Sequence, residues 1–103
     1  MIVDRFGVPL NLNDLVYWTT GGGYTKVGMI KALNGQELRI VAMHYGYYAR
    51  ANPLTWRTTW PYRVGVIASE VISLSHIQPN VEVLRGLEQF YQEWKKKNGK
   101  KAF

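Results

Sequence analysis

The chain of 103 residues contains no cysteine. It therefore cannot form disulfides, thiolate zinc sites or iron–sulfur clusters, and it has no cysteine nucleophile. No apolar run approaches the roughly 20 residues that a membrane-spanning helix needs. Met1–Asn11 also lacks the charged-then-apolar order of a signal peptide. We therefore expect a single soluble, cytoplasmic domain that has no membrane partner.

Acidic residues are also scarce, since seven Asp and Glu stand against 13 Lys and Arg, for a net charge of +6. No carboxylate occurs from Met43 to Val64, a segment that contains Arg50, Arg57 and Arg63. The last acid is Glu93, and after it come Lys95, Lys96, Lys97, Lys100 and Lys101. This distribution predicts an anionic partner, of which nucleic acid is the commonest. For the lysine tail alone, a role in solubility is an equal alternative.

Sequence patterns of catalysis are missing as well. The chain has no HExxH, DxD, GxSxG or GxxxxGK[ST] motif. Gly21–Gly23 lead into a strand-like segment, whereas a phosphate cradle needs a helix N-terminus at that point. His44 and His76 have no carboxylate or second imidazole at the spacing of metal ligands. We therefore expect no catalytic residue, no metal site and no cofactor, and a protein that is not an enzyme.

The segments that are present alternate apolar and polar residues, as β-strands do. The Asn34-Gly35 pair lies between two of them and predicts a two-residue type I′ turn, because Asn and Gly both tolerate positive φ. Ala68-Ser69-Glu70 resembles one helical turn. The expected strands are Met1–Phe6 (weak), Asp14–Thr19, Tyr24–Leu33, Gln36–Met43, Tyr62–Ile67 and Val71–Leu74.

The pattern changes near residue 77 to that of an amphipathic helix. Its apolar stripe has helical spacing and consists of Val81, Leu84, Leu87, Tyr91 and Trp94. Pro79 and Asn80 favour a helix start, and Asn98-Gly99 favours an end. We expect helix 77–98 to pack on the β domain of residues 1–76, and the basic tail 99–103 to be disordered. Alternatively the stripe forms a homodimer seam or enters a partner's groove, which exposure of Phe90 would favour.

These elements predict a mainly β protein, a small and strongly bent antiparallel barrel of five to six strands with a C-terminal amphipathic α-helix. Four segments resemble the SH3-like small barrels, which include KOW and Tudor-like modules and small proteins of tailed bacteriophages. They are Asn13–Tyr17, Tyr24 with Val27–Ile30, Leu38–Val41, and Ser69–Leu74. The resemblance covers about 60% of the chain and implies a non-enzymatic binding module for nucleic acid or a host protein. For a phage protein, the compartment would be the host cytoplasm.

The binding site is predicted in the aromatic and arginine-rich segment that follows residue 43. Aromatic faces stack bases of single-stranded nucleic acid, while Arg and Lys contact the phosphates. The candidate residues are Lys26, Tyr45, Tyr47, Arg50, Trp56, Arg57 and Arg63. Tyr48, Trp60 and Tyr62 are expected to be mostly structural. Two alternatives remain: the aromatic patch binds a host protein, such as the transcription machinery or a nuclease, or its rings only fill the core.

Overall fold

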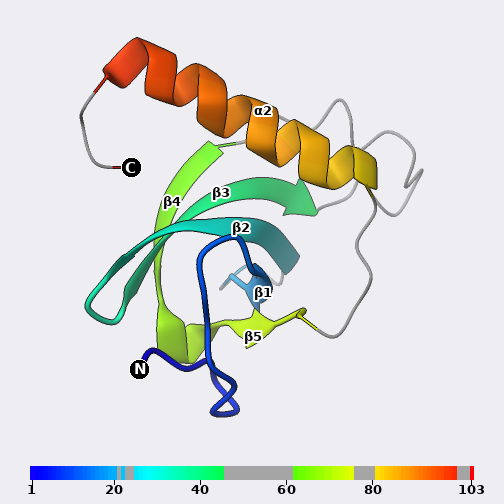
Figure 1. Ribbon diagram of the computed structural model, residues 1–103. Helices are drawn as coiled ribbons and strands as arrows, with labels where there is room; N and C mark the ends of the chain where they lie inside the picture. Colours follow the sequence, from blue (N-terminus) through cyan, green and yellow to red (C-terminus); the bar gives the residue numbers. More distant parts are fainter. Residues whose placement is uncertain (21, 23–24, 46–61, 76–80, 100–102) are drawn as a thin grey trace.

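The computed structural model describes residues 1–20, 22, 25–45, 62–75, 81–99 and 103 (Figure 1). They form a bent antiparallel sheet of five strands in the order β4-β3-β2-β1-β5, followed by one C-terminal helix. The strands are β1 (Leu15–Thr19), β2 (Thr25–Asn34), β3 (Glu37–Tyr45), β4 (Tyr62–Ile67) and β5 (Ile72–Ser73). The helix, α2, is Val81–Asn98. The predicted mainly β architecture with a C-terminal helix is therefore confirmed, although the described strands form an open sheet and do not close into a barrel.

Two local predictions need correction. Met1–Phe6 is not a strand of the sheet, because its only strand-like pairing in the described part of the chain is one bridge between Val3 and Pro9. The turn between β2 and β3 lies one residue later than expected, since Asn34 pairs with Glu37 and the central residues are Gly35 and Gln36. Only Gly35 has a positive φ, of 61°. That pattern is typical of a type II′ turn, which takes Gly at its first central position.

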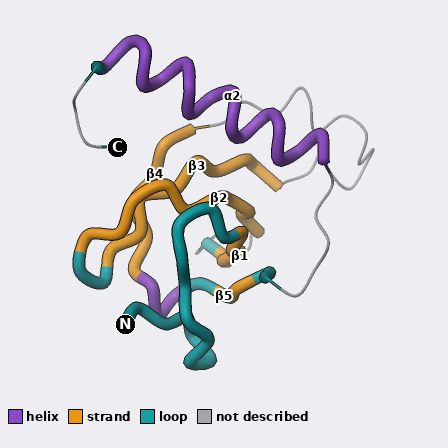
Figure 2. Tube along the Cα trace, in the orientation of Figure 1, coloured by secondary structure: helices purple, strands orange, loops and turns teal. Residues whose placement is uncertain are grey.

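Both faces of the sheet are covered by apolar residues. Because side chains alternate along a strand, neighbouring positions of β1 serve different cores: Leu15 faces the helix, and Val16 faces the concave side. The concave core contains the fully buried side chains of Ile30, Leu38 and Ile40. The fold thus has a layer inside the bent sheet and a second layer between the sheet and α2 (Figure 2).

The helix uses its predicted apolar stripe to pack on the sheet. Leu87 is fully buried among residues of β1, β2 and β3, and Leu84, Tyr91 and Trp94 pack against the same cluster. Phe90 also packs there, so it is not the exposed ring that would have favoured a partner. α2 ends at Asn98, as expected, and the next residue, Gly99, has a φ of 60° and donates its N–H to the Lys95 carbonyl. No helix in the described ranges is long and apolar enough to cross a membrane.

The N-terminal loop is tied to the far edge of the sheet by one buried carboxylate. Asp4 is only 4% exposed, and its Oδ1 accepts the backbone N–H groups of Phe6 and Val8 at 2.8 Å. Its Oδ2 accepts the N–H of Ser73 in β5, also at 2.8 Å. Arg5 adds a backbone hydrogen bond to the carbonyl of Val71. Asp4 therefore connects two segments that lie far apart in the sequence.

Candidate nucleic-acid interface

The structure describes two of the seven predicted site residues in full, Lys26 and Arg63. Tyr45 is the last residue of β3, but its side chain lies outside the described part of the chain. The other four candidates, Tyr47, Arg50, Trp56 and Arg57, also lie outside the described residues. The geometry of the site can therefore be built from Lys26, Arg63 and whatever surrounds them.

Lys26 and Arg63 lie on opposite faces of the sheet. Lys26 of β2 is directly opposite the buried Trp18 of β1, so both side chains share the concave face. The Lys26 Nζ lies 5.1 Å from the ring centre of Tyr62, which packs against the concave core as expected. Arg63 pairs with Val41, whose side chain belongs to the helix-facing layer. These two cations therefore do not form one continuous patch.

Arg63 instead joins a group of aromatic side chains on the helix side. Its guanidinium carbon lies 5.0 Å from the ring centre of Trp94 and 6.0 Å from that of Phe103. Phe103 meets Trp94 and Tyr91 edge to face, at centroid distances of 5.0 and 5.3 Å. Lys95 extends the group, because its Nζ lies 5.5 Å from the Tyr91 ring centre. We call Arg63, Tyr91, Trp94, Lys95 and Phe103 the helix-side cluster.

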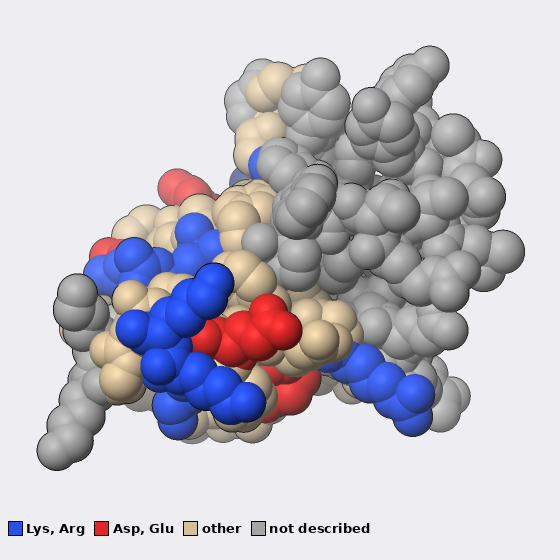
Figure 3. Space-filling view, turned by 90° about the horizontal axis from the view of Figure 1, so that it is seen from above, with Lys and Arg blue, Asp and Glu red and all other residues tan. Residues whose placement is uncertain are grey.

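The surface around this cluster is basic. Lys95, Lys96 and Lys97 form the last turn of α2 and are exposed, as is Arg63. Figure 3 looks down on the helix side, and there most of the visible Lys and Arg side chains gather on the left, with Asp and Glu side chains beside them. Within the described residues, no carboxylate forms an ion pair with Arg63 or with these three lysines. Their charges are therefore available to an anion.

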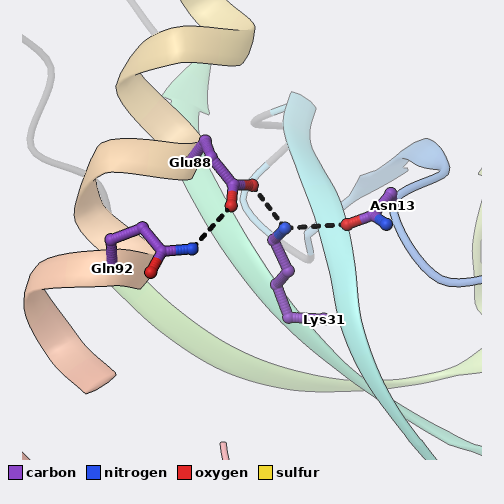
Figure 4. A network of polar contacts seen from close by, with 4 residues as sticks. All are labelled: Asn13, Lys31, Glu88 and Gln92. Atoms are coloured by element: carbon purple, nitrogen blue, oxygen red, sulfur yellow. Dashed lines mark hydrogen bonds and ion pairs between the residues drawn. The ribbon is translucent and has the colours of Figure 1, made fainter. Parts of the chain in front are cut away.

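A separate cation under the helix has its charge already satisfied (Figure 4). Lys31 is the extra residue of a β-bulge in β2, and its side chain is only 7% exposed. Its Nζ donates to Glu88 of α2 and, at 2.7 Å, to Asn13, and lies 4.6 Å from the Tyr91 ring centre. Hydrogen bonds from Lys31 and then Gln92 lower the pKa of Glu88. This network fixes the helix on the sheet and carries no spare charge for a ligand.

The helix-side cluster combines two partly exposed rings with cations that form no ion pair with a described carboxylate. An arginine stacked on an indole keeps its N–H groups at the edge of the plane, where they can donate to phosphate. Tyr91 and Trp94 are partly buried and retain some exposed surface. The arrangement is thus suited to anionic, base-bearing polymers. In the described portion of the chain, no three His, Asp or Glu side chains gather as a metal site would require.

Sequence reasoning named Arg63 but missed its surroundings. The alternation of β4 and the stripe of α2 together placed Arg63 and Trp94 on facing surfaces, so that signal was present. Phe103 gave no such signal. It is 6% exposed and packs between β4 and α2, whereas we expected the tail to add little packing. Phe103 follows five residues without a large apolar side chain, so it belongs to no periodic apolar pattern.

Comparison of the chain with protein-family models, with curated proteins and with solved structures finds no match.

Proposed function

We propose that this chain is a small non-enzymatic protein that binds nucleic acid without strong sequence preference. The helix-side cluster supplies one contact surface, and the arginines and aromatics of residues 45–63 supply another. The observation that carries the proposal is the exposed Arg63, which lies 5.0 Å from the Trp94 ring centre beside three exposed lysines that form no ion pair with a described residue. Exposed rings favour single strands, because unpaired bases can stack on them.

We also propose that the sheet is of the SH3-like type. Supporting this, β1 pairs with both β2 and β5, and a 3-10 turn at Ala68–Glu70 joins β4 to β5. Small β-modules of this kind commonly serve as binding platforms, with function set by the side chains they display. The fold therefore agrees with a binding role but does not select the ligand.

The test is binding of a fluorescein-labelled 20-nucleotide oligothymidylate, measured by anisotropy over a range of NaCl concentrations. We expect log K to fall linearly with log salt, because phosphate contacts release counterions. R63Q should weaken binding about tenfold, since a charge-assisted contact is lost, and should make the salt slope shallower by about 0.7.

R5Q is the matched control, because it removes the same charge from the exposed Arg5, whose backbone hydrogen-bonds to Val71 beside β5 and which is not part of the helix-side cluster. It should change the affinity less than twofold. Equal effects of R5Q and R63Q would reduce the interaction to general attraction by net charge and contradict the proposed site. Absence of oligonucleotide binding would contradict the function itself and favour a protein partner for the aromatic segment, for which a weak salt dependence is expected.

The same assay tests the segment outside the described residues. W56A combined with R57A should weaken binding by about 2–4 kcal/mol, because a stacking contact and a phosphate contact are lost together. Circular dichroism must show that the double variant remains folded. A neutral double variant would restrict the interface to the helix-side cluster.

A further inference from the structure

The sheet has an open seam between β4 and the end of β1. In the described residues β4 pairs only with β3, so its other edge has no strand partner. β5 pairs with β1 at Val16 and Tyr17 and does not continue along Trp18 and Thr19. A cavity of about 490 Å³ lies between these two edges. Its lining residues are Trp18, Thr19, Thr20, Glu37, Val64, Gly65, Val66, Ile67 and Glu70.

The charge of the seam is opposite to that of the molecule. Its two ionisable lining residues, Glu37 and Glu70, are both acidic, although the chain carries a net charge of +6. The Glu37 side chain lies over Gly65 of β4, where a Cβ atom would meet its flexible carboxylate end. Arg39 donates its Nε to the Glu37 Oε1 at 2.9 Å. Glu70 is exposed and forms no ion pair with a described residue.

Part of the cavity wall is apolar, and the rest is polar. Trp18 and Val66 are buried residues of the concave core, and both line the cavity. Lys and Arg side chains have an apolar stem and a charged end, so they match an apolar wall with carboxylates at its mouth. The volume is also within the range of about 300–1,000 Å³ typical of ligand sites.

We propose that this seam binds an extended segment of a protein partner, which pairs with the free edge of β4 and places a Lys or Arg side chain in the cavity. An unpaired strand edge offers its backbone N–H and C=O groups to an added strand, and side-chain pockets beside it give specificity. Nucleic acid does not suit the seam, because its phosphates would face the exposed Glu70 carboxylate, which forms no ion pair with a described residue. The lining of the cavity contains no member of the helix-side cluster, so this proposal goes beyond the proposed function.

The experiment selects binders from a displayed library of random heptapeptides on the full-length chain. We expect enriched peptides to carry a Lys or Arg at a fixed position between alternating β-branched residues. The affinity of the best peptide is then measured by calorimetry. E70K should weaken it at least tenfold, and E93K, which makes the same charge change on the exposed face of α2, less than twofold. Replacing the peptide's conserved Lys or Arg by Gln should cause a loss similar to that of E70K.

Three results would overturn the proposal. They are a selection that enriches no peptide, an enrichment of peptides without a basic residue, and an affinity that E70K and E93K lower equally. Competition between the best peptide and the labelled oligothymidylate would also contradict a separate site. Thermal unfolding of both variants shows whether each retains the fold. The peptide and oligonucleotide assays are independent, so failure of the peptide proposal would not contradict the proposed nucleic-acid binding. Failure of the nucleic-acid proposal would likewise not contradict peptide binding.

Discussion

Asp4 is a carboxylate whose ionised form is stabilised by the fold. Burial opposes that form, but hydrogen bonds from the backbone N–H groups of Ser73, Val8 and Phe6 together lower the pKa of Asp4. A lowered pKa means that the stabilisation is complete above the ordinary carboxyl pKa and is lost as the pH falls through the folded-state value. The pKa of Glu88 is lowered too, so the stabilisation by its ionised form is also lost as the pH falls.

The substitution D4N should therefore lower the free energy of unfolding at pH 7 by about 1–3 kcal/mol, since an amide N–H₂ would face the Ser73 N–H. The difference from wild type should shrink at pH 3, below the ordinary carboxyl pKa, because the stabilisation by the ionised carboxylate is lost as the pH falls towards the lowered folded-state pKa of Asp4. Urea unfolding at both pH values measures this, with the exposed E93Q as a control expected to be nearly neutral. A D4N penalty that is the same at both pH values would contradict the role of the ionised carboxylate.

The Lys31–Glu88 pair should respond unequally to removal of its two members. Lys31 is almost fully buried, whereas the Glu88 side chain is 43% exposed. E88A leaves a buried ammonium with Asn13 as its remaining side-chain acceptor among the described residues, and should cost about 1–3 kcal/mol. K31M leaves a carboxylate that water can reach and fills the site with apolar atoms, so it should cost less than E88A. Denaturant unfolding of the two variants compares them, and the reverse order would contradict this account.

At the scale of elements, the β2–β3 hairpin separates the roles of two adjacent residues. Gly35 has positive φ and open space around it, whereas Asn34 occupies the last strand position with ordinary φ. G35V should therefore lower the free energy of unfolding by about 1–2 kcal/mol through backbone strain alone. N34V should have little effect, because β-branched residues suit a strand. If urea unfolding gave equal losses for G35V and N34V, the central turn residues would be Asn34 and Gly35, and this assignment would be wrong.

The elements themselves were largely predictable, and their exact boundaries were not. Alternation located Tyr62–Ile67 and the helical period located α2, because both patterns arise from which face is buried. The turn lies one residue later than expected because Asn34 still pairs with Glu37, and a local pattern does not reveal this register. The expected strand at Met1–Phe6 is a loop, since the Asp4 side chain takes backbone N–H groups there.

At the scale of the whole molecule, the end of the chain combines a structural role and an electrostatic one. Phe103 is buried against α2 and Arg63, so F103A should lower the melting temperature and loosen Trp94. We expect a loss of about 3–5 kcal/mol in the free energy of unfolding, the usual range for a buried phenylalanine. K100Q with K101Q should leave stability unchanged and make the oligonucleotide salt slope shallower by up to about 1.4. If F103A were as stable as wild type, the tail would have only an electrostatic role.

The candidate site was predictable in composition and not in arrangement. Charge counting and aromatic content selected Arg63 and Lys26, but strand parity separates them onto opposite faces. The partners of Arg63 come from a helix about 30 positions later in the chain and from Phe103, contacts that depend on tertiary packing. The seam was not predicted at all, because an unpaired edge is a property of the sheet order.

The hydrogen bond from Ser73 to Asp4 also bears on the order in which the protein folds. It joins residues 69 positions apart, while β1 to β3 are connected by short loops that close at little entropic cost. The hairpin strands can therefore assemble before the two ends of the β domain meet, which places the Asp4 contact after the rate-limiting step. Loss of this carboxylate should therefore accelerate unfolding and leave the refolding rate nearly unchanged. The hydrogen bonds of Asp4 would then determine the lifetime of the native state.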